Sequence, residues 1–176
     1  MYKEKFFLRS NKMAERNIRI FINSVRYEVE ASLFSEGDSE ELLEFFDCEE
    51  GDPEPEKTQI KSLGIFKIDG NMAEVSFEET ALTGMEGSRT AVSFDMRSPE
   101  IVTMLRTGSV STALVFEKGK RHHCVYNTPY MTFEVCVHTL DIKNEIADKG
   151  TVSIDYIVEI RGARAERTKF SMRIMD

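Results

Sequence analysis

Apolar and polar residues alternate with a period of two along most of the chain. The clearest runs are Ile18–Leu33, Thr90–Met96, Val110–Phe116, Met131–Val137, Val152–Ile160 and Phe170–Ile174. Successive side chains of a β-strand point to opposite faces, so this pattern predicts strands with one dry face and one wet face. One-sided strands of this kind are typical of antiparallel sheets, and we expect an all-β protein.

Turn-forming residues separate these runs. They include Asp69-Gly70-Asn71, Gly84–Gly87, Ser98-Pro99, Lys118-Gly119-Lys120, Asn127-Thr128-Pro129 and Lys149-Gly150. Regular turns at intervals of about 10 residues indicate one hairpin after another. The sequence therefore predicts an antiparallel up-and-down barrel of about 8–10 strands, which would leave no sheet edge exposed.

The first run changes phase in its middle. Ile18, Ile20 and Ile22 occupy one face, whereas the apolar residues from Val25 onward occupy the other. A one-residue slip moves every later side chain to the opposite face of a strand. We interpret this slip as a β-bulge near Asn23-Ser24 in one long first strand.

An acidic insert at 35–56 interrupts the strands. Ser39 can cap a short helix, and the large apolar residues of that helix are Leu42, Leu43, Phe45 and Phe46. A Glu/Asp/Pro linker would then return the chain to the barrel. The helix could cover the barrel mouth, dock on a partner groove, or cover a bare patch of its own barrel.

Charge is concentrated in that insert. The chain has a formal net charge of −8, and residues 36–56 hold eleven acidic residues and no Lys or Arg. Residues 1–16 sum to +3, so the remainder is electrically balanced. Nucleic-acid binding normally requires a basic surface that releases phosphate counterions, and we expect no nucleic-acid partner.

The domain boundaries follow from the same patterns. We expect residues 1–16 to form an N-terminal extension and residues 17–176 to form one barrel domain, with translation starting at Met1 or at Met13. No apolar stretch is long enough to span a membrane as a helix. Three cysteines without a signal peptide favour a reducing, cytoplasmic location.

Two charged residues share the dry face of their predicted strands. Glu79 follows the phase of Val75 and Phe77, and Arg106 follows that of Val102 and Met104. Buried charges are normally paired, so one interpretation is a structural ion pair that closes the barrel. The other is a ligand site in which Arg106 forks onto a carboxylate, with hydroxyls from Tyr126 and Thr128.

Other reactive side chains give weaker signals. His122, Cys124, Cys136 and His138 could bind zinc if two neighbouring strands brought them together, but their spacing matches no zinc motif. Ser109 and Ser111 lack the surroundings of a catalytic serine. We therefore expect no metal, no cofactor and no catalytic residues, and an enzymatic activity is the least supported of the functions that the sequence leaves open.

Several blocks of sequence occur in an order that resembles a known family. The blocks are Ser76–Thr80, Leu82–Gly87, Leu105–Val110, Phe116 and Tyr126–Tyr130, followed by the two terminal strands. They are similar to the YwiB-like family of uncharacterised bacterial proteins, over residues 17–34 and 57–175. This resemblance implies a calycin-like barrel, broadly similar to lipocalins, in a cytoplasmic setting, and it implies no established reaction.

These observations give two functional hypotheses. The first is a non-enzymatic barrel that binds a small apolar or amphiphilic ligand in its cavity, with Arg106, Glu79, Tyr126 and Thr128 as ligand-binding residues. The second is a protein-interaction module that binds a partner through residues 36–56, with a barrel filled by its own side chains.

Overall fold

The computed structural model describes residues 13–29, 54–160 and 165–175 of the 176-residue chain. Within these ranges, ten antiparallel strands form a closed barrel, which confirms the predicted fold class. The strands are β1 (Ala14–Val29), β2 (Glu56–Asp69), β3 (Met72–Glu78), β4 (Ser88–Asp95), β5 (Ile101–Gly108), β6 (Ser111–Glu117), β7 (Arg121–Asn127), β8 (Thr132–Glu145), β9 (Thr151–Ile160) and β10 (Ala165–Met175). Two helical turns, η2 (Ala81–Thr83) and α2 (Ile146–Lys149), connect strands.

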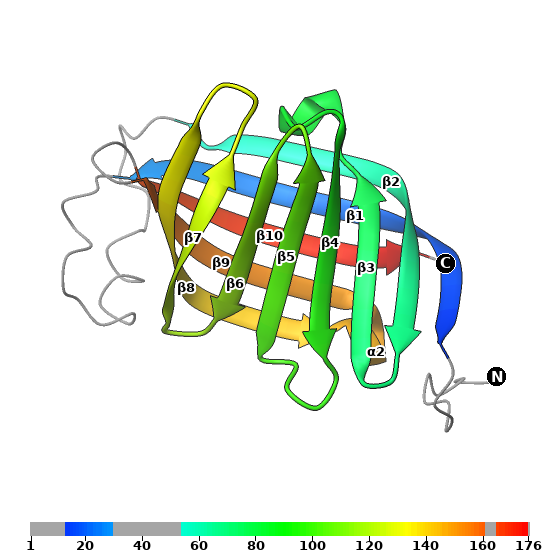
Figure 1. Ribbon diagram of the computed structural model, residues 1–176. Helices are drawn as coiled ribbons and strands as arrows, with labels where there is room; N and C mark the ends of the chain where they lie inside the picture. Colours follow the sequence, from blue (N-terminus) through cyan, green and yellow to red (C-terminus); the bar gives the residue numbers. More distant parts are fainter. Residues whose placement is uncertain (1–12, 30–53, 161–164, 176) are drawn as a thin grey trace.

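Each strand pairs with its neighbours in the chain, and β1 also pairs with β10 to close the barrel. Figure 1 shows two layers whose strands cross at a steep angle. Strands β3 to β7 form the front layer, and β1, β2 and β8 to β10 form the back layer. The predicted hairpin-after-hairpin order is therefore the observed topology.

The inward side chains fill one end of the barrel. The alternation of the sequence places large apolar residues there with 7% exposure or less: Ile18, Ile20, Val75, Val92, Phe94, Val102, Phe116, Val137, Ile154 and Met172. Burial of each such side chain contributes about 1.5–3 kcal/mol, so this packed end is the main source of stability. We call it the filled end.

The predicted bulge in the first strand is wrong. Strand β1 keeps one continuous register with β2 and with β10 from Arg19 to Arg26. Ser24 and Arg26 therefore continue the inward phase of Ile22, and Val25 lies on the outer face. Among the described strands, the pairing register shifts only in β8, between Thr139 and Asp141.

The ends of the predicted segments also need correction. Strand β1 begins at Ala14, so residues 14–16, which we assigned to the N-terminal extension, pair with β2. Glu56, the last residue of the predicted acidic insert, is the first residue of β2. The helix predicted from Ser39 lies outside the described residues.

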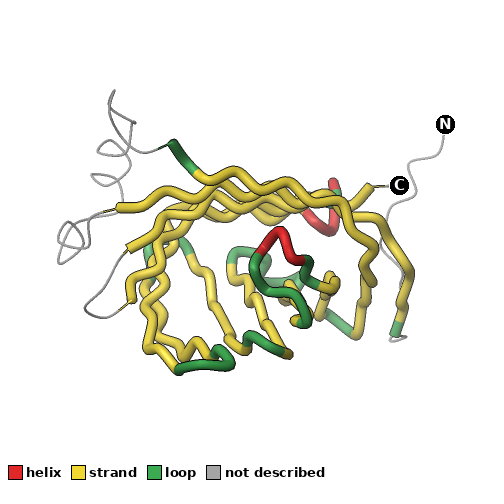
Figure 2. The backbone as a smooth tube through the Cα atoms, turned by 90° about the horizontal axis from the view of Figure 1, so that it is seen from above, coloured by secondary structure: helices red, strands yellow, loops and turns green. Residues whose placement is uncertain are grey.

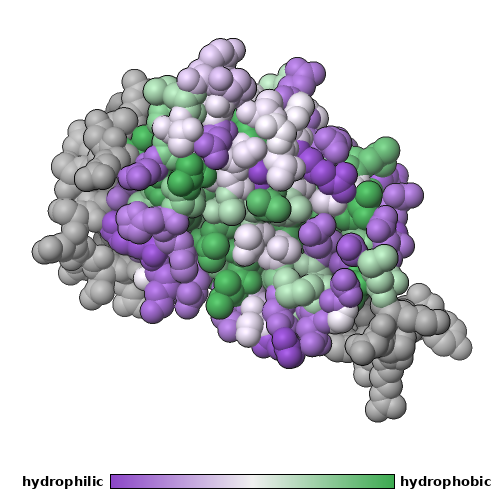
Figure 3. Space-filling view, viewed as in Figure 1, coloured by the Kyte–Doolittle hydropathy of each residue, from purple (hydrophilic) through white to green (hydrophobic). Residues whose placement is uncertain are grey.

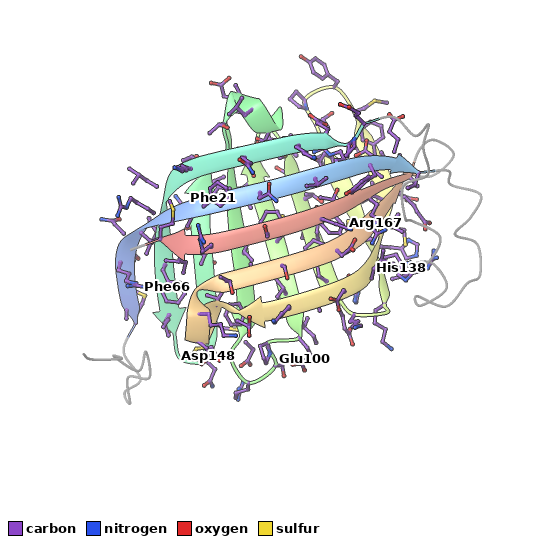
Figure 4. The ribbon with its side chains drawn as sticks, turned by 180° about the vertical axis from the view of Figure 1, so that it is seen from behind. Phe21, Phe66, Glu100, His138, Asp148 and Arg167 are labelled. Carbon is purple, nitrogen blue, oxygen red and sulfur yellow. The ribbon has the colours of Figure 1, made fainter. Side chains whose placement is uncertain are left out.

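A second apolar cluster lies on the outer face of the back layer. Leu140, Ile157 and Ala165 are buried there, and Val29 packs against them. Beside them, Arg167 donates two hydrogen bonds to Asp155, at 2.9 and 2.7 Å. Figure 4 shows this layer from behind, with Arg167 and His138 at the same end. Such a bidentate pair links β9 to β10 next to the strand that closes the barrel.

The β5–β6 hairpin requires glycine at position 108. Gly108 has a φ of 121°, and a Cβ atom added there would lie 2.3 Å from the carbonyl oxygen of Gly87. Gly84 also has a positive φ, of 69°, but an added Cβ would meet nothing within 4 Å. Substitutions at the two positions therefore distinguish the cost of a positive φ alone from the cost of a positive φ with a steric clash.

We predict that Gly108→Ala lowers the free energy of unfolding far more than Gly84→Ala does. Gly84→Ala should cost about 1–2 kcal/mol, which is the cost of a positive φ for a residue with a Cβ. Gly108→Ala adds a backbone clash to that strain. Urea denaturation monitored by circular dichroism measures both values, and equal losses would contradict this account of the hairpin.

Candidate functional site

The end of the barrel opposite the filled end contains a cavity of about 680 Å³. Its lining comes from both layers and from the loop between β3 and β4, which includes η2. Figure 2, viewed from above, shows η2 over the space between the two layers. The four residues predicted as a ligand site, Glu79, Arg106, Tyr126 and Thr128, all line this cavity.

Glu79 and Arg106 face each other inside the cavity. Glu79 lies just beyond the end of β3, and Arg106 lies on β5. The Nε atom of Arg106 lies 3.8 Å from Oε1 of Glu79, and their side chains are 13% and 4% exposed. The same Oε1 accepts a hydrogen bond of 2.5 Å from the hydroxyl of Thr90. The structure thus contains the buried ion pair that the strand phases predicted.

The guanidinium of Arg106 keeps unused hydrogen-bonding capacity. Its Nε atom is buried and, within the described residues, has no hydrogen-bond acceptor. Its Nη2 atom donates to Met104 Sδ at 3.3 Å, and a thioether is a weak acceptor. A guanidinium has five donors, so this pairing leaves Arg106 able to bind an anionic group.

Polar residues form an inward-facing row across the front layer, and three of its four members, Thr90, Arg106 and Tyr126, line the cavity. Thr90, Arg106, Thr112 and Tyr126 are successive cross-strand neighbours from β4 to β7. The next inward row towards the filled end contains Val92, Met104 and Leu114 instead. The front wall is therefore polar near the mouth and apolar below.

The back wall has a matching polar row. Glu56, Arg26, Thr168 and Tyr156 are cross-strand neighbours from β2 through β1 and β10 to β9, and all four line the cavity. Arg26 contacts Glu56 at 3.3 Å and Glu166 at 3.7 Å. Burial raises the pKa of Tyr156, whereas the charges of Arg106 and Arg26 and a hydrogen bond with Thr168 oppose that rise. Charged groups of both walls therefore act on the pKa of Tyr156.

Sequence reasoning missed the residues of the back wall. Ser24 and Arg26 were assigned to the outer face because the apolar phase switches at Val25. An unbroken strand with polar inward residues gives the same pattern, and it would have placed Arg26 in the cavity. Tyr156 belongs to the alternating run Val152–Ile160, but it was not among the predicted ligand-binding residues.

Tyr126 and Thr128 hold the loops around the mouth. The Tyr126 hydroxyl donates to Met85 Sδ at 3.7 Å, which connects β7 to the β3–β4 loop. The Thr128 hydroxyl donates to the carbonyl oxygen of Met131 and accepts from the backbone N–H groups of Tyr130 and Met131. The hydroxyl of Thr128 is therefore engaged in the β7–β8 turn, although the residue lines the cavity.

The other reactive side chains do not converge. Cys124 packs against the core, whereas Cys136 and His138 lie on the outward face of β8. Burial raises the pKa of both cysteine thiols. Among the described residues, no three His, Cys, Asp or Glu side chains group in a way that could hold a metal ion.

Ser109 and His122 are also far apart. Ser109 donates to the carbonyl oxygen of Glu86 and bonds the Ser88 hydroxyl, so it stabilises the hairpin beside Gly108. Ser111 pairs with Asn127, and His122 lies five residues from Asn127 along β7. The Cα atoms of Ser111 and His122 are therefore at least roughly 16 Å apart, and Ser109 lies beyond Ser111. No hydrogen bond between a serine and a histidine base is possible at that separation.

The closed antiparallel barrel and its internal cavity define a calycin-like, or lipocalin-like, protein. Residues 47–172 match the family described as "Domain of unknown function (DUF1934)", and the chain belongs to this family. A solved structure, the crystal structure of the YwiB protein from Bacillus subtilis, has the same fold. It is 17% identical, with a TM-score of 0.63, over 93% of this chain and 96% of that chain. A comparison with curated proteins found no match.

Two expectations concern other parts of the chain. Among the described residues, no helix is both long and apolar enough to cross a membrane. Residues 36–53, which hold most of the predicted partner-binding segment, lie outside the described residues. Partner binding through residues 36–56 therefore stays a prediction.

We predict that Glu79→Ala lowers the free energy of unfolding by about 3 kcal/mol, because it leaves the Arg106 guanidinium buried without its counter-charge. The double variant Glu79→Ala with Arg106→Met should recover part of this loss. The matched control is Glu78→Ala, because Glu78 is the adjacent residue and its side chain is 71% exposed. Chemical denaturation of the four proteins measures the effect, and equal losses for Glu78→Ala and Glu79→Ala would refute it.

Proposed function

We propose that this protein is a non-enzymatic barrel that binds one small amphiphilic ligand in its cavity. The single observation that carries the proposal is the incompletely bonded guanidinium of Arg106, inside a cavity of about 680 Å³. Cavities that bind small molecules usually measure about 300–1,000 Å³. The volume and the guanidinium together support a molecule of a few hundred daltons with an anionic head group.

The lining supports an amphiphile rather than a purely polar or purely apolar molecule. Apolar side chains from several strands line the cavity: Ile22, Ile60, Phe77, Met104, Leu114, Val135 and Phe170. The two polar rows lie above them, nearer the mouth. A ligand with an apolar body and one charged end satisfies both parts of this lining, because buried polar groups need partners.

Arg106 anchors the head group in this proposal. A carboxylate, sulfonate or phosphate accepts two parallel hydrogen bonds from a guanidinium. Glu79 holds the guanidinium in place, and Thr90 fixes Glu79 through its hydroxyl. Tyr126, two strands from Arg106 in the same layer, supplies a further hydroxyl, and Thr128 shapes the mouth.

Binding of 8-anilinonaphthalene-1-sulfonate tests the proposal. This probe is apolar, carries a sulfonate, and fluoresces when it enters an apolar site. We expect one probe per folded chain, displaced by dodecanoate. In the Glu79→Gln background, Arg106→Met should weaken binding by about 10- to 100-fold, because a charge-assisted hydrogen bond contributes about 1.5–3 kcal/mol.

Comparison within the Glu79→Gln background isolates Arg106, since no unpaired carboxylate remains in the double variant. Arg97→Met is the surface control, because Arg97 is 71% exposed and pairs with Asp95 on a turn. The proposal fails if the folded protein binds no probe, or if binding is the same with and without Arg106.

A further inference from the structure

The outer face of the front layer contains a patch without charge. It is formed by residues that point outward from β4, β5, β6 and β7. They are Ala91, Ser93, Ile101, Thr103, Leu105, Ala113, Val115 and Val125. Figure 3 shows apolar side chains gathered in the middle of this face. We call these residues the front patch.

The residues of the front patch form continuous cross-strand rows. Leu105 pairs with Ala91 on one side and with Ala113 on the other. Thr103 pairs in the same way with Ser93 and Val115. Leu105 and Val125 are 45% and 47% exposed, so the patch is accessible in the isolated chain.

The sequence of β5 and β6 differs from that of β2 and β10. The outward faces of β2 and β10 carry charged residues such as Lys61 and Lys169, as expected for a solvated face. By contrast, Ile101–Leu105 and Ala113–Phe116 are uncharged on both faces. Near-continuous apolar runs are typical of strands that are covered on both sides. The cavity and core cover only the inward side.

We infer that the front patch is the interface of a homodimer, in which the front layers of two copies pack face to face. An uncharged patch is complementary to itself, because two copies can meet around a two-fold axis without burying a charge. The patch spans four strands and about five residues, roughly 15 Å in each direction. This area of about 225 Å² forms only the apolar centre, and the surrounding polar rim supplies most of the roughly 800 Å² that each partner contributes to a standard interface.

The charges at the rim of the patch favour a dimer in which the strands of the two copies run in opposite directions. Arg89 lies at one end, beside Thr107, and Glu117 lies at the other, beside Ile101. A two-fold axis that lies in the interface, roughly perpendicular to the strands, places the end that carries Arg89 in each copy over the end that carries Glu117 in the other. Within its own chain, Arg89 contacts Glu78 and Ser76, and Glu117 contacts His122. Opposite charges at the rim favour this register over the parallel one.

Sedimentation equilibrium of the full chain, from low to high micromolar concentration, tests the inference. The wild type should be a dimer. Leu105→Glu should weaken dimerisation by about 100-fold or more, because each copy would bury an unpaired carboxylate. The matched control is Leu63→Glu, since Leu63 is 76% exposed on the outer face of β2 and should leave the dimer intact.

A charge-swap experiment distinguishes a second copy from a different partner. Leu105→Glu alone and Leu105→Lys alone should both be monomeric, and an equimolar mixture should dimerise, because the two-fold axis sets the two side chains close together. Dimerisation through the front patch does not involve the cavity, so probe binding is expected in monomer and dimer alike. A failed dimerisation test would therefore leave the proposed function standing. A monomeric wild type, a dimeric Leu105→Glu variant, or a mixture that stays monomeric would overturn the inference.

Discussion

Closure of the sheet by β1 is the constraint on which the structure depends. This long strand pairs with β2 along one edge and with β10 along the other, so the first and last strands of the fold are joined. An open sheet of ten strands would expose two edges with unsatisfied N–H and C=O groups. Closure also fixes which residues face inward, and it places Arg26, Thr168 and Tyr156 in one row across three strands.

The closed barrel is divided into two parts with different roles. Large aliphatic and aromatic side chains fill one end and stabilise the fold, whereas threonines, tyrosines and two ion-paired arginines line the other end. The buried polar groups of the second part cost stability unless they are bonded. Polar groups retained around an open volume are the basis of the proposed binding cavity, and the packing of the filled end offsets their cost in stability.

The sequence allowed much of this arrangement to be predicted. Period-two alternation predicted the antiparallel barrel, and the phase of Val75, Phe77, Val102 and Met104 correctly placed Glu79 and Arg106 on the inside. The same method failed for Arg26 because it assumes that apolar residues always point inward. Beyond Ile22, the inward residues of β1 line a cavity and are polar, so the apolar residues that follow are the outward ones.

The remaining errors arise from information that is not local. The distance between Glu79 and Arg106 depends on the register of three strands, which alternation does not specify. Likewise, alternation along β8 placed Cys136 on the outer face, but the pairing of β7 with β8 was needed to place Cys124 on the inner face, away from it. The uncharged outward faces of β5 and β6 were visible as two apolar runs, but their significance depended on knowing which face was already covered.

The central claim is that the cavity binds an amphiphile through an anionic head group. Native mass spectrometry tests it most directly, with the protein incubated with equal amounts of three amphiphiles that share one alkyl tail and carry a carboxylate, a sulfate or an ammonium group. The account predicts one bound molecule per chain, drawn from the two anionic compounds and lost on denaturation. Binding of none of the three, or equal binding of the ammonium compound, would contradict it.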